Sequence, residues 1–183
     1  MDEKTLVQLS LEGNNDAFEE LVKKYKTKMF NLAFSMTHNR ESADDLAQDI
    51  FIKSYAALKN FRFQSEFGTW IYRIALNHIK DFLRTENRMV KVPFEEGYRQ
   101  MGEQEDEILK RERDITQEKR QHLVYDGIRA LPEKYRTILS LRDIQGFSYE
   151  EIGQILKLSA GTVDSRLHRA RKLLRKKIAP FFS

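Results

Sequence analysis

The chain has 183 residues, enough for one large domain or two small ones, and its 40% apolar and 33% charged residues are typical of a globular protein. It contains no cysteine, which excludes disulfides and thiolate metal sites and fits a reducing compartment. The first residues are acidic where a signal peptide needs basic ones, and no apolar run approaches the roughly 18 residues of a membrane-spanning helix. We therefore expect a cytoplasmic protein that is not inserted in a membrane.

The predicted elements are all helices, because only three prolines and eight glycines interrupt the chain and apolar residues recur at helical spacing. The pattern predicts an all-α fold with two small helical domains. The first, residues 1–90, is expected to be a bundle with helices over 2–11, 16–36, 40–58 and 66–88. Residues 91–120 have little apolar periodicity and are interpreted as a flexible linker, helical towards its end, that leads to a second domain over residues 121–183.

The helix expected over 40–58 has two unlike faces. Small and aliphatic side chains mark the face that should be buried, whereas the outward face carries an acidic stripe beside an apolar residue, formed by Asp45, Gln48, Asp49 and Ile52. Such a surface suits a protein partner, and a merely solvated face explains the pattern equally well. No nucleophile or histidine lies near these carboxylates in the sequence, so we do not expect an enzyme.

Aromatic and basic residues alternate over residues 61–84. Phe67 and Trp70 are expected in the core, whereas the loop 62–66 and the side chains of Tyr72, Asn77 and Lys80 are expected outside. Rings beside cations suit the binding of single-stranded nucleic acid, since bases stack on the rings while the cations hold the phosphates. The stretch is therefore either a strand-binding surface or, for most of its rings, part of the core.

Positive charge is concentrated near the C-terminal end. Residues 1–90 are balanced, with 13 basic and 13 acidic residues, whereas residues 121–183 hold 12 basic and 6 acidic residues. Residues 166–177 alone hold seven basic residues and no acidic one. This distribution favours a polyanionic partner.

The C-terminal residues have the pattern of a helix-turn-helix. A helix is expected from Pro132 to about residue 144, ending near Gly146. Ser148 and Glu151 form a capping-box pattern at the start of a short helix that should end near residue 156. After a turn of three or four residues, Ser159 is expected to cap the last helix.

The last helix carries an apolar stripe, which is formed by Val163, Leu167, Ala170 and Leu174. Polar and basic residues lie opposite the stripe or beside it, with the reach to contact base edges and phosphates in a major groove; they are Ser165, Arg166, His168, Arg169, Arg171 and Lys172. A solvated basic helix end is the simpler alternative. The histidines are not spaced as metal ligands, and we expect no metal and no cofactor.

At three places the chain resembles the bacterial RNA polymerase sigma factors of the extracytoplasmic-function (ECF) type. The polymerase-binding helix of sigma region 2 is similar to DDLAQDIFIKSY, and the stretch that follows it in the family is similar to FGTWIYRIALN. Region 4 is similar to ALPEKYRTILSLRDIQGFSYEEIGQILKLSAGTVDSRLHRARKLLR. The resemblance covers nearly the whole chain and identifies residues 1–90 with region 2 and residues 121–183 with region 4.

The resemblance implies partners and a role for each surface. The clamp helices of the polymerase β′ subunit would bind Asp45, Gln48, Asp49 and Ile52, and region 4 would also contact the β flap. The −10 promoter element would be bound and opened, with one base flipped into a pocket, by Arg62, Phe63, Gln64, Ser65, Tyr72, Asn77 and Lys80. The −35 element would be bound by Ser165, Arg166, His168, Arg169, Arg171 and Lys172. Control by an anti-sigma protein, often membrane-bound, is common in such a family.

Three residues depart from the family's pattern. Asp49 replaces a commoner glutamate, Gly153 stands where alanine is usual, and Asp164 occupies a position that is often basic. A carboxylate near the DNA side of the last helix would repel phosphate or accept a hydrogen bond from a cytosine amino group, so the −35 sequence preferred by this chain is expected to differ from the common one.

Two other functions remain as alternatives. A stand-alone helix-turn-helix repressor or activator would bind duplex DNA tightly without polymerase, usually as a dimer, and no dimerisation element is apparent in the sequence. An RNA-binding helical protein would prefer RNA to promoter DNA.

Overall fold

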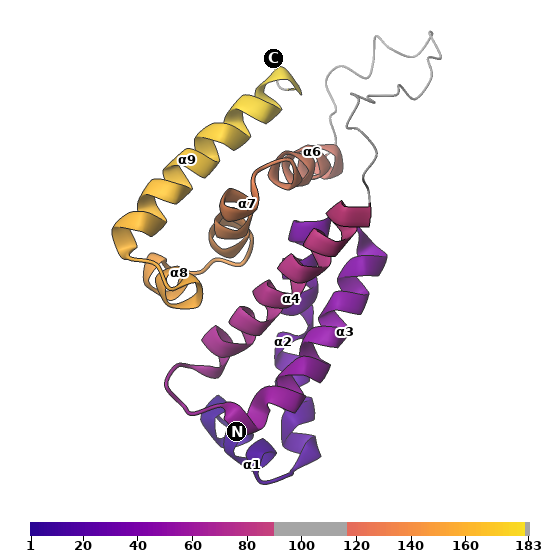
Figure 1. Cartoon of the computed structure of the whole chain (residues 1–183), viewed down its shortest axis with the longest axis vertical. Coiled ribbons are helices and arrows are strands. Elements are labelled where there is room, and N and C mark those ends of the chain that lie inside the picture. Colours follow the sequence, from indigo (N-terminus) through magenta and orange to yellow (C-terminus); the bar gives the residue numbers. More distant parts are fainter. Residues whose placement is uncertain (90–116, 182–183) are drawn as a thin grey trace.

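A computed structural model describes residues 1–89 and 117–181, and every regular element within them is helical. Figure 1 shows the N-terminal module below and the C-terminal module above it. The elements of the first are α1 (Glu3–Leu11), α2 (Asn15–Thr37), α3 (Arg40–Ala57), η1 (Leu58–Asn60) and α4 (Phe67–Met89). Those of the second are α6 (Gln117–Arg129), α7 (Glu133–Leu139), η2 (Ser140–Ile144), α8 (Tyr149–Leu156), α9 (Ala160–Ile178) and η3 (Ala179–Phe181).

The first three helices begin where a short polar side chain can accept a hydrogen bond from the first turn. The caps are Asp2, Asn14 and Asn39, whose side-chain oxygens accept from backbone N–H groups three residues on, at 2.8, 3.1 and 2.9 Å. Each cap satisfies one of the N–H groups that a helix start leaves without a partner. The predicted helices of the N-terminal module are confirmed to within one or two residues.

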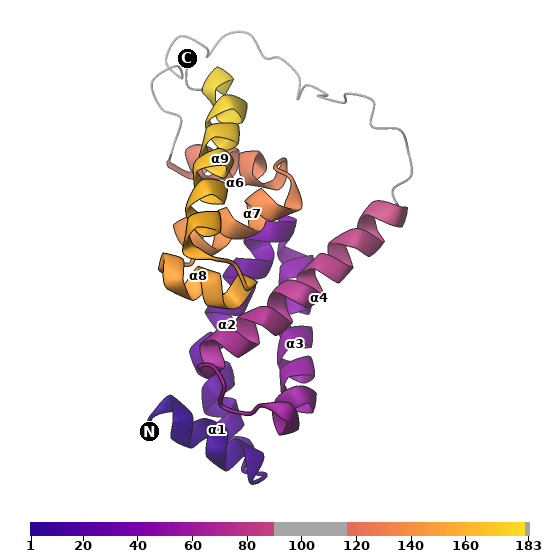
Figure 2. The ribbon, with the colours of Figure 1, turned by 60° about the vertical axis from the view of Figure 1, so that its left-hand side comes forward.

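The N-terminal module is a bundle in which α2, α3 and α4 pack on one another and α1 crosses the lower end (Figure 2). Its core holds Met29, Leu32, Ile50 and Ile71, none of which is measurably exposed. The predicted buried face of α3 is confirmed, because Ala43, Leu46, Ala47, Ile50 and Ser54 are buried.

The C-terminal module contains the predicted helix-turn-helix, α8 followed by α9. Both capping-box hydrogen bonds of α8 are present, with Ser148 Oγ accepting from the Glu151 N–H at 3.2 Å and Glu151 Oε2 accepting from the Ser148 N–H at 2.7 Å. Ser159 caps α9 as expected. The helix predicted to continue to residue 144 is α-helical only to Leu139 and then widens into the π-helical turn η2, which ends before Gly146 at φ 79°.

The two modules contact each other, because α2 packs against η2 and α6 and α4 packs against α8. Their buried apolar residues form one cluster. The predicted linker, residues 91–120, lies outside the described residues except for 117–120, which begin α6. The domain boundaries at residues 90 and 121 therefore stay a prediction.

The capping box predicts the effect of a single substitution. Ser148→Ala removes the acceptor for the Glu151 N–H and should lower the free energy of unfolding by about 1 kcal/mol. Urea denaturation measures the change. Ser42→Ala is the matched control, because this serine also lies in a first turn but its side chain is not the cap; an equal loss in both variants would contradict the assignment.

Candidate functional site

The outward face of α3 is free in the structure. Asp45, Gln48 and Asp49 are exposed, and Ile52 is 67% exposed, which is unusual for an isoleucine in a packed helical protein. The carboxylate of Asp49 lies 3.1 Å from Nε2 of His78 on α4, which fixes its direction. The predicted exposure of the four residues is confirmed, and Asp49 is paired with His78 while it remains at the surface.

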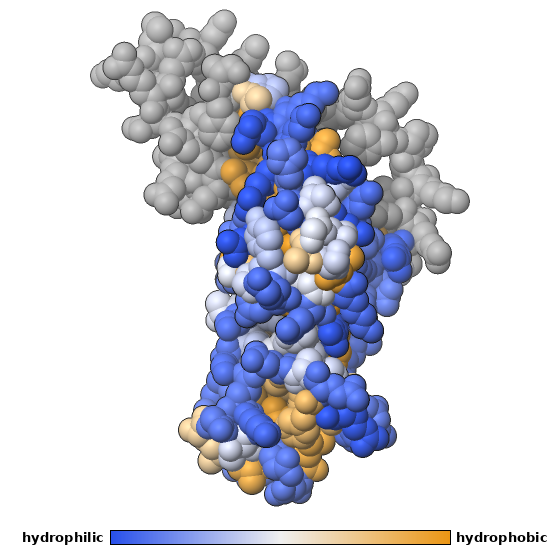
Figure 3. All heavy atoms as spheres, turned by 90° about the vertical axis from the view of Figure 1, so that its left-hand side faces the viewer, coloured by the Kyte–Doolittle hydropathy of each residue, from blue (hydrophilic) through white to orange (hydrophobic). Residues whose placement is uncertain are grey.

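A cavity of about 710 Å³ opens beside the start of α4. Its walls come from α1, α2, the loop 61–66, α4 and the start of α8, and rings of Tyr25, Phe61, Phe63, Phe67 and Tyr72 line it. Figure 3 shows apolar side chains gathered low on the face where α1 and this loop lie, with hydrophilic residues around them. Three lysines and four acidic residues also line it, so its rings, rather than a net positive charge, are what could hold an unstacked base.

The loop presents Phe63 to the cavity in an uncommon backbone conformation. Its φ is 54°, in the left-handed region that bulky residues rarely adopt, and its ring stays 40% exposed at 4.9 Å from the ring of Phe61. Phe67 is buried and Trp70 is partly buried against the core, as expected.

The residues predicted to bind a single strand do not all gather at the cavity. Phe63, Ser65 and Tyr72 line it. Arg62 and Gln64 are exposed on the loop beside it, and Asn77 is exposed further along α4. Lys80 is only partly exposed, with its ammonium 3.4 Å from a carboxylate oxygen of Glu133 in the other module.

The prediction that Tyr72 lies outside is wrong. Tyr72 is 1% exposed, its ring packs edge-on against Phe147 with 4.7 Å between centroids, and its hydroxyl donates to Oε1 of Gln145 at 2.8 Å. Burial raises the pKa of the Tyr72 phenol above its usual range, so the hydroxyl remains a neutral donor. The physical reason is that α4 is covered on two sides, whereas a single apolar stripe predicts cover on one.

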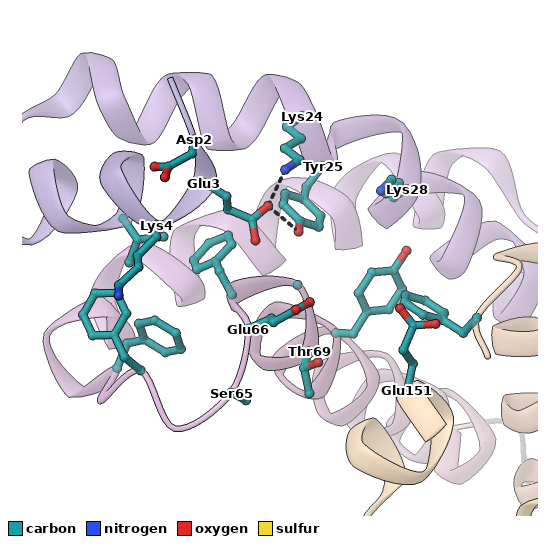
Figure 4. Close-up of a pocket in the computed structure, with 17 residues that line it drawn as sticks. Asp2, Glu3, Lys4, Lys24, Tyr25, Lys28, Ser65, Glu66, Thr69 and Glu151 are labelled. Atoms are coloured by element: carbon teal, nitrogen blue, oxygen red, sulfur yellow. Dashed lines mark hydrogen bonds and ion pairs between the residues drawn. The ribbon is translucent and has the colours of Figure 1, made fainter. Parts of the chain in front are cut away.

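Sequence reasoning missed the lysines of the cavity, which lie among the carboxylates of Asp2, Glu3, Glu66 and Glu151. Lys4 comes from α1, and Lys24 and Lys28 come from α2. Figure 4 shows Glu3 of α1 directed at Lys24 and Tyr25, and these contacts attach α1 to the rim. No local pattern connects these lysines with residues 61–72, because only the packing of the bundle brings them together.

The predicted polar face of α9 is exposed. Ser165, His168, Arg169 and Lys172 face solvent and Arg166 is half-buried, whereas Val163, Leu167 and Ala170 of the stripe are buried. Asp164, the departure from the family's pattern, lines a shallow hollow of about 390 Å³ together with His168 and Lys172. It therefore lies among the residues predicted to contact DNA.

Arg171 has a partner inside the protein. Its guanidinium donates two hydrogen bonds to the carboxylate of Asp143 on η2, from Nη2 at 2.7 Å and from Nε at 3.3 Å. The hydrogen bond to Asp143 raises the pKa of Arg171 above its ordinary value. This two-point contact fixes α9 against η2, so Arg171 positions α9 in this structure.

A double-mutant cycle measures this contact. Because the side chains are 45% and 39% exposed, solvent screens the pair, and we expect Arg171→Ala and Asp143→Ala to be coupled by about 0.5–1 kcal/mol in the free energy of unfolding. Lys172→Ala combined with Asp143→Ala is the control pair and should be additive. Coupling no larger than in the control would mean that the bond does not hold the helix.

Comparison with known proteins supports the sequence interpretation. The family model described as sigma-70 region 2 matches residues 21–89, and the model described as sigma-70, region 4 matches residues 121–174. The RNA polymerase sigma-H factor of Pseudomonas aeruginosa is 38% identical, over 97% of this chain and 94% of its own length. The ECF RNA polymerase sigma-E factor of Escherichia coli is 35% identical over 98% and 96%, and SigW of Bacillus subtilis is 34% identical over 91% of both.

A solved structure shares the fold. The structure of CnrH in complex with the cytosolic domain of CnrY matches with a TM-score of 0.72 over 97% of both chains at 24% identity. Among the described residues, no helix has the length and apolar character that a membrane span needs. The two family models and the nearly full-length relatives show the family: the chain belongs to the ECF RNA polymerase sigma factors.

Proposed function

We propose that this sigma factor binds core RNA polymerase through α3, contacts the −35 element with α9, and captures a −10 strand in the aromatic cavity. The observation that carries the proposal is that one chain holds both a helix-turn-helix with an exposed basic face and a ring-lined cavity with lysines at its rim. The first suits duplex DNA and the second suits a single strand. A promoter that is bound and then melted presents both forms.

The polymerase surface is the outward face of α3. The exposed Ile52 supplies apolar area at the end of a polar strip that occupies the two preceding turns of α3 and is formed by Asp45, Gln48 and Asp49. The proposed partner is the pair of β′ clamp helices, and region 4 would meet the β flap. The cations on such a partner would be attracted to the carboxylates and guided to this strip.

The −10 surface is the cavity together with the loop 61–66. A flipped base would enter between the rings, with Phe63 as the exposed stacking partner and Lys4 and Lys28 near its phosphates, while Lys24 is paired with Glu3. Arg62, Gln64 and Asn77 lie exposed along the path of the strand. Tyr72 and Lys80 would join this surface only when the contacts with the C-terminal module are broken.

The −35 surface is the exposed face of α9. Ser165, His168, Arg169 and Lys172 are placed for base edges and phosphates, with Arg166 beside them. Asp164 on the same side would select against a phosphate contact and favour a cytosine amino group. We further propose control by an anti-sigma protein, and no catalytic role for the chain itself.

Substitution in α3 tests the polymerase surface. Asp49→Arg reverses the charge at the centre of the strip and should abolish co-purification with core polymerase, together with run-off transcription. Asp16→Arg makes the same charge change at an exposed position of α2, outside the α3 strip, and should retain both activities. Unchanged recruitment by Asp49→Arg would remove α3 from the interface.

Substitution in α9 tests the −35 surface. Arg169→Ala should weaken binding of the −35 element by about 1–3 kcal/mol, the value of one good base contact, when holoenzyme is titrated with promoter DNA. An equal loss on all sequences would make Arg169 a phosphate contact instead. Strong, sequence-specific duplex binding by the chain without polymerase, in a mobility-shift assay, would favour the repressor or activator alternative.

A further inference from the structure

The carboxylate of Asp49 is held from the neighbouring helix. Nε2 of His78 on α4 lies 3.1 Å from Oδ2 of Asp49 on α3. An ionised carboxylate can only accept a hydrogen bond, so Nε2 carries the proton and donates it. The side chain of Asp49 is still 55% exposed. The contact therefore gives the carboxylate a direction without covering it.

Both residues of this pair are attached to well-packed backbone. The helices α3 and α4 pack side by side in the bundle (Figure 1 and Figure 2). Ile50, next to Asp49, and Ile79, next to His78, have no measurable exposure. The side chain of His78 is itself only 19% exposed, so its ring has little freedom to move. A polar group that is held from a packed helix keeps its direction better than one held by solvent alone.

The other polar residues of the strip are held less firmly. Within residues 1–89 and 117–181, the side chains of Asp45 and Gln48 make no hydrogen bond or ion pair. They lose conformational freedom only when a partner binds, and that loss reduces the affinity. Asp49 has lost much of this freedom before binding, because His78 already orients it. Asp49 is therefore the preorganised charge of the strip.

We propose that His78 is a positioning residue for polymerase binding, which holds the Asp49 carboxylate in the direction from which a cationic side chain of core polymerase meets it. This inference rests on the proposed function of α3. Asp49 makes the contact with polymerase, and His78 acts only through Asp49. A role in charge alone has the opposite consequence. If His78 merely weakened the negative field of the strip, its removal would strengthen the binding of a cationic partner.

Two amide side chains at position 78 test the positioning. The amide nitrogen of glutamine lies about as far from the backbone as Nε2 of histidine, whereas that of asparagine reaches only as far as Nδ1. His78→Gln keeps a donor at the contact and should retain the affinity for core polymerase within about twofold. His78→Asn loses the contact and should raise the Kd about threefold to tenfold, the range expected from the side-chain freedom that Asp49 regains.

Biolayer interferometry measures these affinities, with core polymerase immobilised and the unlabelled full chain in solution at one salt concentration. Urea denaturation of each variant shows that the compared proteins are folded under the binding conditions. His78→Gln is the matched control, because it makes a similar change of size and charge at the same position. An unchanged or lower Kd for His78→Asn would overturn the positioning role, as would equal weakening by the two variants.

A double-mutant cycle separates failure of this inference from failure of the proposed function. Asp49→Ala should weaken binding at least about tenfold. Adding His78→Asn to it should cause no further loss, because no carboxylate remains to be positioned. A second loss would mean that His78 acts by another route. No loss from Asp49→Ala would instead contradict the assignment of α3 to polymerase, and the inference would fail with it.

Discussion

The arrangement of the two modules depends on α4, which packs against the N-terminal bundle on one side and against the C-terminal module on the other. One side of this helix completes the core of the N-terminal bundle through Ile71, Ala75 and Ile79, and Tyr72 extends the buried surface towards Phe147. A helix with a single apolar stripe would leave Tyr72 in water. Its ring and hydroxyl both have partners in the other module, so the contact between the modules completes the burial of this side of α4.

Two charge pairs in the structure differ in what they do. Arg171 and Asp143 both lie within the C-terminal module, and their bond fixes α9 against η2. Lys80 and Glu133 belong to different modules, so their contact joins the two modules. A basic residue near a candidate DNA surface therefore needs its protein partner identified before it is assigned to phosphate.

The sequence predicts what depends on local periodicity and capping. The helix starts at Asn39, Ser148 and Ser159 and the buried faces of α3 and α9 follow from residues within a few turns. The sequence does not predict the lysine rim, the burial of Tyr72 or the bond of Arg171, because each joins elements that are distant in the chain. These contacts result from the packing of helices on one another, and the apolar stripe of one helix does not determine which residues of another helix it will meet.

Gly153, where the family usually has alanine, lies next to the residue of α8 that contacts α4. A Cβ at Gly153 would lie 2.9 Å from the Leu158 carbonyl oxygen, so alanine at this position requires the turn between α8 and α9 to shift. Leu158 donates back to the Gly153 carbonyl at 2.9 Å, which keeps the turn tight. The next residue, Gln154, supplies the carbonyl that Arg73 of α4 holds. Glycine at this position therefore allows the tight turn between α8 and α9 beside the carbonyl that Arg73 of α4 contacts.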